Sequence, residues 1–216
     1  MKKRNIFAMA FLFALSVLAA GCVTVVPIGH ESDFTGEKQF NAAADVENIW
    51  ADKALPDLKE HAVDLAQLLT AAHGNLDADT VAQEFQGHYS MGDRGAVSYV
   101  VQGEGVVTHM DRSKKVGTMT VKLAGYDGPV IVKLQIGPVY KGSAVRDTIS
   151  FMKYEDYKNQ VDWAKVSQAF HQMLDKDVIA QANPESLQGK TISFYGVFTV
   201  DGNQEILIMP VEIQTK

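Results

Sequence analysis

Cysteine is almost absent from this 216-residue sequence, which contains a single one, Cys22. One thiol excludes an intramolecular disulfide and any metal site built from several thiolates. The six histidines do not replace the missing thiolates, because no two of them have the spacing of a helical zinc motif. The sequence therefore predicts neither a metal site nor a cofactor.

Catalytic and nucleotide-binding motifs are also missing. The sequence contains no G-x-S-x-G nucleophile turn. Gly103-Glu104-Gly105 is not followed by a helix that would bind phosphate. We therefore expect a protein that is not an enzyme.

Basic residues are scarce once the N-terminus is set aside. Three of the 20 Lys and Arg residues and none of the 26 Asp and Glu residues precede Cys22, so residues 22–216 carry a formal net charge of −9. Nucleic-acid binding depends on Lys and Arg side chains that neutralise phosphates. The composition therefore excludes nucleic acid as a partner.

A long apolar run occurs only at the N-terminus. Three basic residues at positions 2–4 precede an apolar stretch over residues 6–20, which is the pattern of a secretory signal peptide and is short for a transmembrane helix. Leu18-Ala19-Ala20-Gly21-Cys22 resembles a bacterial lipobox. The resemblance implies cleavage before Cys22 and lipidation of that residue. The alternative is an ordinary signal peptide followed by a chance cysteine.

Lipidation of Cys22 would attach the chain stably to a membrane, because more than one acyl chain would be buried. Val23 stands where the sorting rule of enteric lipoproteins places Asp for inner-membrane retention. We therefore expect a lipid-anchored protein of the bacterial envelope that faces the periplasm, at the outer membrane rather than the inner. Residues 1–21 are the predicted signal peptide, and residues 22–40 are the lipidated cysteine and a tether.

The segment 41–90 is predicted to be helical. Asn41 is a plausible N-cap, and Pro56 suits the first turn of a second helix. An apolar stripe runs from Leu58 to Ala72 at spacings of three and four, which predicts one continuous helix. Asp77 or Asp79 is expected to cap a short third helix.

Residues 91–216 alternate apolar and polar side chains, which is typical of strands. Gly103 and Gly105 are expected to break the first strand as a bulge. A helix is predicted at 156–180, and Asp201-Gly202-Asn203 predicts a hairpin between the last two strands. Three strands, a helix and two strands give an α+β fold: a helical segment followed by an OB-like five-stranded antiparallel barrel with an inserted helix. The alternative is an α+β sheet with helices on one face.

Polar residues and glycines are dense between the third strand and this helix, where connections often carry sites. One interpretation is a pocket in which Arg146 and Asp147 bind a sugar-like or anionic ligand. Tyr140, Tyr154 or Tyr157 would stack on a sugar face. The other candidate ligand-binding residues are Ser143, Asn159 and Gln160.

The other interpretation of this stretch is structural. Arg146 would pair with a carboxylate such as Asp156 and fix the joint between strand and helix. Asn159 and Gln160 would then satisfy loop carbonyls. The sequence alone leaves both interpretations open.

Several motifs resemble one family over nearly the whole mature chain. They are Gly-Pro-Val-Tyr-Lys-Gly-Ser-Ala-Val-Arg-Asp at 137–147, Asn159-Gln160, Gly189-Lys190, Gly196-Val197-Phe198 and Pro210, with Ile49-Trp50 and Pro56 upstream. The chain is similar to the predicted periplasmic lipoproteins classed as domain of unknown function 2291. The resemblance implies an envelope lipoprotein encoded near sugar-type ABC transporters, and it implies no catalytic residues.

Three functions follow as hypotheses. The first is a non-enzymatic accessory or binding module for sugar-type ABC solute uptake, with a transporter or solute-binding protein as partner. The second is a hydrolase that uses Asp147 or Asp156 as base and Arg146 as electrophile. The third is a structural envelope protein that docks a partner through helices at 41–86, which requires an exposed apolar face there.

Overall fold

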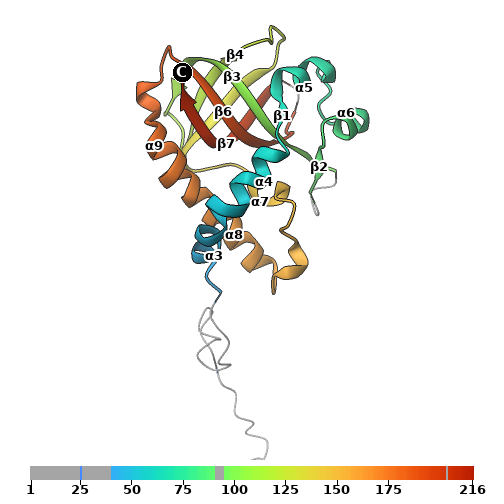
Figure 1. The fold of residues 1–216 in the computed structure, drawn as a ribbon, viewed down its shortest axis with the longest axis vertical. Helices are drawn as coiled ribbons and strands as arrows, with labels where there is room; N and C mark the ends of the chain where they lie inside the picture. The colour runs from blue at the N-terminus through green and yellow to red at the C-terminus, as the bar shows by residue number, and fades with distance from the viewer. Residues whose placement is uncertain (1–24, 26–39, 91–94, 203) are drawn as a thin grey trace, which may run out of the picture. The chain divides into compact units, whose positions relative to one another are not determined.

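Alternating apolar residues from Val97 onward build five long strands that close into a barrel (Figure 1). The structure, a computed structural model, describes residue 25 and residues 40–90, 95–202 and 204–216. Residues 41–216 form one compact unit. The expected signal peptide, Cys22 and nearly all of the tether lie outside the described residues, so these features stay predictions.

The barrel strands follow the order β3-β4-β5-β7-β6, and pairing between β3 and β6 closes the ring. Within this ring β5 and β7 are parallel, and the other neighbours are antiparallel. The bounds are β3 (Val97–Asp111), β4 (Val116–Leu123), β5 (Ile131–Pro138), β6 (Thr191–Thr199) and β7 (Glu205–Thr215). The arrangement is a five-stranded OB barrel with helices between the third and fourth strands, which confirms the predicted fold.

Side chains that alternate along the strands fill the barrel interior. Met119 on β4, Leu134 on β5 and Ile208 on β7 are each 0% exposed. A barrel of this size has an interior that side chains can fill completely. A ligand site therefore has to be sought on the outside of the barrel wall.

The prediction that Gly103 and Gly105 break the first strand is wrong. β3 is continuous, and near Gly105 its pairing passes from β6 on one edge to β4 on the other. The bulge lies further on, between Val107 and His109. Gly105 is needed for close approach, because a Cβ there would lie 2.4 Å from the carbonyl oxygen of Lys122.

The first helices form one continuous stretch. The predicted cap is confirmed, since the Asn41 side chain accepts a hydrogen bond from the Ala44 N–H at 3.2 Å. α3 (Ala42–Ile49) leads through a π-helical turn, η1 (Trp50–Ala54), into α4 (Leu55–Glu60), whose first turn holds Pro56 as expected. Proline has no N–H and its ring crowds the carbonyl four residues before it. The wider turn before Pro56 accommodates this.

The apolar stripe from Leu58 to Ala72 lies on two helices, so the prediction of one continuous helix is wrong. β1 (Val63–Asp64) interrupts it, and Asp64 caps α5 (Leu65–Ala72) by accepting the Gln67 N–H at 2.9 Å. A strand of two residues is too short to show an alternating apolar pattern in the sequence, so it could not be predicted.

The expected acidic cap on the next helix is also wrong. α6 (Asp79–Glu84) has Ala78 as its N-cap, and Asp79 instead accepts the hydroxyl of Tyr89 at 2.7 Å. Tyr89 belongs to β2 (His88–Tyr89), which pairs with β3, as β1 also does. The segment 41–90 is therefore joined to the barrel sheet through β1 and β2.

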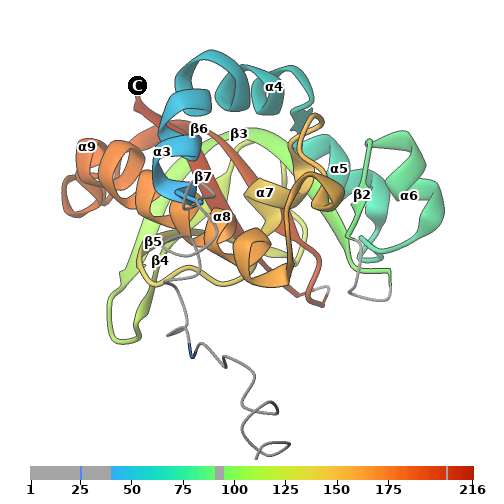
Figure 2. The ribbon, with the colours of Figure 1, turned by 90° about the horizontal axis from the view of Figure 1, so that it is seen from below.

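The long helix begins four residues later than predicted. After η2 (Tyr154–Asp156), Asn159 caps α8 (Gln160–Met173) by accepting the Asp162 N–H at 2.9 Å. η3 (Leu174–Ile179), α9 (Ala180–Ala182) and η4 (Pro184–Ser186) follow. Figure 2 shows α3 and α8 side by side across one end of the barrel. In the part of the chain that is described, no helix has the length and apolar character to cross a membrane.

The Asn159 cap gives a first testable prediction. Asn159→Ala should lower the free energy of unfolding by about 1 kcal/mol, because the first turn of α8 loses a partner for a backbone N–H. Urea unfolding measures the change. Gln160→Ala, on the neighbouring exposed residue, is the control and should be close to neutral. Equal losses in the two variants would contradict the capping role.

Candidate functional site

Arg146 and Asp147 lie on the short helix α7 (Ala144–Thr148), which the sequence did not predict. Arg146 is buried, and its Nε and Nη2 lie 2.7 and 2.6 Å from Asp147 Oδ1. Ser143 donates its hydroxyl to Asp147 Oδ2 at 2.5 Å. The three residues therefore form one largely buried charge-assisted cluster. The carboxylate that pairs with Arg146 is Asp147, where the structural interpretation of the sequence suggested one such as Asp156.

The guanidinium of Arg146 is fixed further by α8. Its Nη1 donates to the carbonyl oxygen of Trp163 at 2.9 Å, and its Cζ lies 4.2 Å from the centroid of the Trp163 ring. Tyr154 and Tyr157 pack around the same indole, with centroid distances of 6.1 and 4.8 Å. Two of the predicted stacking residues thus pack against Trp163 within the fold.

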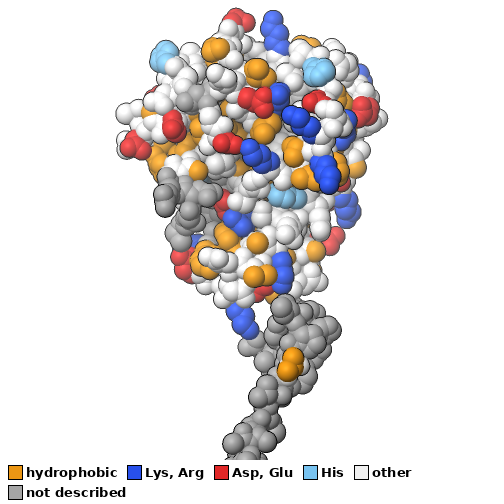
Figure 3. All heavy atoms as spheres, turned by 180° about the vertical axis from the view of Figure 1, so that it is seen from behind, with side chains coloured by type: hydrophobic (Ala, Val, Ile, Leu, Met, Phe, Trp, Pro, Cys, Tyr) orange, Lys and Arg blue, Asp and Glu red, His pale blue; other side chains and the backbone are white. Residues whose placement is uncertain are grey.

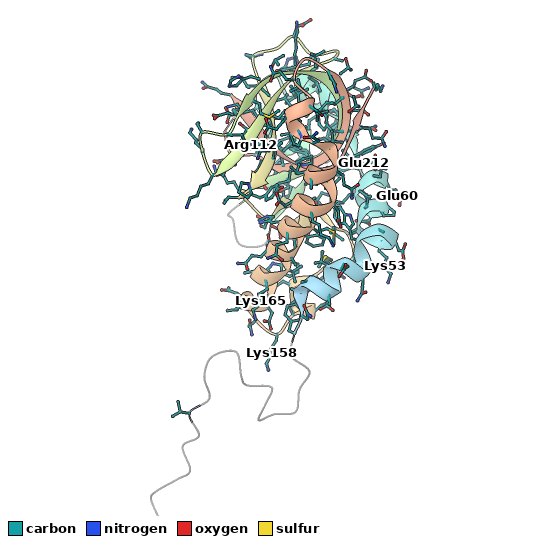
Figure 4. All side chains as sticks on the ribbon, turned by 90° about the vertical axis from the view of Figure 1, so that its left-hand side faces the viewer. Lys53, Glu60, Arg112, Lys158, Lys165 and Glu212 are labelled. Carbon is teal, nitrogen blue, oxygen red and sulfur yellow. The ribbon has the colours of Figure 1, made fainter. Side chains whose placement is uncertain are left out.

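Tyr140 is buried and lies in a second, partly exposed cluster. Its hydroxyl is 3.2 Å from Asp175 Oδ1, and its ring centroid is 5.4 Å from that of His171. Burial, with Asp175 nearby, raises the pKa of Tyr140 well above its ordinary value. Asn159 and Gln160 are exposed at the start of α8, where Asn159 acts as the cap. Figure 4 labels Lys158 and Lys165 at the end of the unit where α8 begins, and Arg112 lies toward the opposite end.

A cavity of about 780 Å³ lies beside Asp147, against the outside of the barrel wall. Its floor is formed by Leu207 and Met209 on β7, whose neighbours Ile206 and Ile208 face the barrel interior. Ser143 and Asp147 are the two predicted site residues in its lining. The other lining residues are Ser90, Ala96, Lys141, Gly142, Thr199, Val200, Asp201, Gly202, Gln204 and Glu205.

Ser90 also lines the cavity, and no pattern in the sequence indicated it. Its Oγ is buried and has no hydrogen-bond partner among the described residues. Buried hydroxyls are normally satisfied, since leaving one unpaired costs about 1–3 kcal/mol. Ser90 lines the cavity, but this oxygen is closed to solvent, so a ligand would bond to it only after the side chain rotates toward the cavity.

The loop 141–143 is held over the cavity from two sides. Gln135 on β5 is fully buried; its Oε1 accepts the Lys141 N–H at 2.7 Å, and its Nε2 donates to the Lys141 carbonyl at 3.2 Å. His171 Nε2 lies 3.0 Å from the carbonyl oxygen of Gly142. Burial lowers the pKa of His171. The backbone of this loop is therefore fixed before any ligand arrives.

The charges around the cavity are paired. Lys141 lies 2.6 Å from Asp201, and Glu205 lies 2.5 Å from Lys133. The hydrogen bond and charge of Lys141 lower the pKa of Asp201. On the face seen from behind, Lys and Arg side chains are likewise interspersed with Asp and Glu (Figure 3).

Among the described residues, no group of three or more His, Cys, Asp or Glu side chains could hold a metal ion.

A second hollow, of about 530 Å³, lies across β3, β6 and β7. Lys59 spans it by pairing with Glu212 at 2.7 Å and lying 4.9 Å from the centroid of Tyr195. Lys216 pairs with Glu104 at its rim. No buried side-chain atom in its lining lacks a hydrogen-bond partner within the described ranges. We therefore take the cavity beside Asp147 as the candidate site.

Barrel topology defines the class of this chain as an OB-fold protein. A solved OB-fold protein from Thermotoga maritima superimposes with a TM-score of 0.65 at 17% sequence identity, over 83% of this chain and 100% of the other. The chain belongs to the predicted periplasmic lipoproteins of domain of unknown function 2291, whose family model matches residues 12–214. This confirms the resemblance noted in the sequence. No curated protein matches the chain.

Proposed function

We propose that this periplasmic lipoprotein is a non-enzymatic binding module that takes a small polar solute into the cavity beside Asp147. The volume of about 780 Å³ lies within the range of small-molecule sites. The observation that carries the proposal is the buried, unpaired hydroxyl of Ser90 in the cavity wall. The prearranged loop 141–143 adds support, since a rigid site loses less entropy on binding.

The envelope setting completes the proposal. Cys22 would carry the lipid, with Val23 favouring the outer membrane, and residues 22–40 would tether the unit. The solute would be handed to or received from a sugar-type ABC uptake system through a transporter or a solute-binding protein. This last element rests on what the family resemblance implies.

The two alternatives have less support. A hydrolase using Asp147 as base would need Arg146 as electrophile, but the guanidinium is committed to Asp147 and Trp163 and is not part of the cavity lining. A structural protein docking through its first helices would need an exposed apolar face there. The large hydrophobic side chains that are exposed in the described part of the chain lie outside α3, α4, α5 and α6.

Thermal unfolding with small polar solutes tests the proposal on the mature chain purified as a bacterial host processes it. A solute at 100 times its dissociation constant should add about 2.7 kcal/mol of stability, which corresponds to a rise in Tm of roughly 5–10 °C. Pentoses, hexoses and nucleosides form the panel. The absence of any shift across the panel would contradict the proposal.

Ser90→Ala locates the binding. The Ser90 hydroxyl has no described partner to lose, so the variant without solute should unfold at the same temperature as the parent or higher. With solute, its Tm shift should shrink. Ser193→Ala in the second hollow is the matched control and should leave the shift unchanged. A full shift in Ser90→Ala would place the binding elsewhere.

A further inference from the structure

We infer that the ligand of this cavity is an uncharged polyhydroxyl compound, bound by hydrogen bonds and contact with an apolar floor. The inference rests on the proposed function and narrows it to a chemical class. Two observations support it. The charged side chains of the lining are already paired with opposite charges, and the lining, as far as its residues are described, contains no unpaired cation and no aromatic side chain.

Each charged lining residue has an opposite charge of its own. Asp147 is bound by Arg146, Asp201 by Lys141, and Glu205 by Lys133, all within 2.7 Å. A charged ligand would have to separate one of these pairs or be buried without a counterion. Separation is costly for the largely buried pair of Arg146 and Asp147, and the two more exposed pairs leave no unmatched charge for a charged ligand. The pairing therefore favours a ligand without net charge.

An anion is disfavoured most strongly. The lining contains three carboxylates and one cation, Lys141, which is already 2.6 Å from Asp201. The sequence suggested that the guanidinium of Arg146 could bind an anionic group. This guanidinium instead lies over Trp163, 4.2 Å from its ring centroid. The bidentate geometry that Arg gives to phosphates and carboxylates is therefore not available to this cavity.

The neutral groups of the lining match hydroxyls. Ser90, Thr199 and Gln204 contribute polar side chains, of which the Thr199 hydroxyl is also 2.8 Å from Ser98 Oγ, and Leu207 and Met209 form the apolar floor. Among the described residues, no aromatic side chain lines the cavity, and Tyr140, Tyr154 and Tyr157 lie elsewhere. We therefore expect the ligand to be bound by hydrogen bonds to its hydroxyls, without the aromatic stacking predicted from the sequence. This pattern suits a polyhydroxyl compound.

Glucose, gluconate and glucosamine test the inference, because they share a six-carbon hydroxylated skeleton and differ in charge. Gluconate is an open chain, unlike the other two, so glucitol is its neutral match. The measurement is calorimetric titration of the mature chain. Glucose should bind at least about tenfold more tightly than gluconate or glucosamine, and its affinity should stay within about twofold when salt rises from about 50 to about 500 mM. Ribose with ribonate, and glucitol with glucitol 6-phosphate, repeat the comparison on smaller and linear skeletons.

Removing a matched pair of charges supplies the control. Lys141→Gln with Asp201→Asn deletes the ion pair at the cavity, and Lys216→Gln with Glu104→Gln deletes a comparable exposed pair at the second hollow. The Lys216/Glu104 double variant should bind glucose within about threefold of the parent, because its pair lies outside the cavity. In the Lys141/Asp201 double variant, which alters the lining, glucose should still bind more tightly than gluconate or glucosamine.

The outcomes separate the two proposals. Tighter binding of gluconate or glucosamine, lost in the Lys141/Asp201 double variant, would overturn the uncharged class and leave a solute-binding cavity in place. Binding of none of the compounds by the parent would overturn both. Binding of glucose that persists in full in Ser90→Ala would show that the polyhydroxyl compound occupies another site.

Discussion

Replacing Arg146 by methionine is expected to lower the free energy of unfolding by about 3–5 kcal/mol. The variant leaves the carboxylate of Asp147 largely buried without its cation, and removes both the hydrogen bond to the Trp163 carbonyl and the stacking on its ring. Breaking a buried pair from one side costs more than the pair itself contributes, because the remaining charge stays desolvated. Urea unfolding with a constant slope measures the loss.

Two further variants make this result specific. Arg146→Met with Asp147→Asn removes the stranded charge and should recover at least about 1.5 kcal/mol. Lys165→Met breaks the pair between Lys165 and Asp162 at 3.1 Å, in which Lys165 is half exposed, and should cost less than about 1 kcal/mol. A loss from Arg146→Met as small as that from Lys165→Met would contradict the buried cluster. Since Arg146 supports the fold so directly, Ser90 is the better residue for testing ligand binding.

Gly105→Ala is the second large effect, with an expected loss of about 2–3 kcal/mol. The added Cβ would lie 2.4 Å from the Lys122 carbonyl oxygen and 2.7 Å from Cγ1 of Val121. The first of these is backbone, so relief requires β3 and β4 to separate where the barrel closes. The loss should appear in both thermal and urea unfolding.

Gln102→Ala, an exposed position on the same strand, is the control for Gly105→Ala and should change stability by less than about 0.5 kcal/mol. Similar losses in the two variants would mean that crowding at Gly105 is not the cause. A Gly105→Ala variant as stable as the parent would mean that β3 and β4 do not approach as closely as the structure shows.

The barrel could be predicted because its signals are local. Alternation from Val130 to Ile136 and the turn at Asp201-Gly202 each lie within a few residues, and the order of strands and helix then indicates the OB topology. The elements that were missed are short. β1 and β2 have two residues each and are defined by pairing with β3, which no local pattern reveals.

The candidate site could be predicted only in part, for a related reason. Ser143 and Asp147 stand in the segment between β5 and α8 that composition singled out. Ser90, Thr199 and Leu207 reach the same cavity from distant parts of the chain. Gln135 was missed because alternation placed it on the polar side of β5, where it is in fact buried under the loop 141–143.

The closure of the barrel has a consequence for the order of folding. Ser98 on β3 pairs with Thr199 on β6, and Ile131 on β5 pairs with Glu205 on β7, so the early strands find these neighbours only after the final hairpin is present. Contacts between residues so far apart in sequence make folding slow, because a long loop must close before they form. A chain emerging N-terminus first, from a ribosome or a secretion channel, would stay without its barrel until its last strand is free.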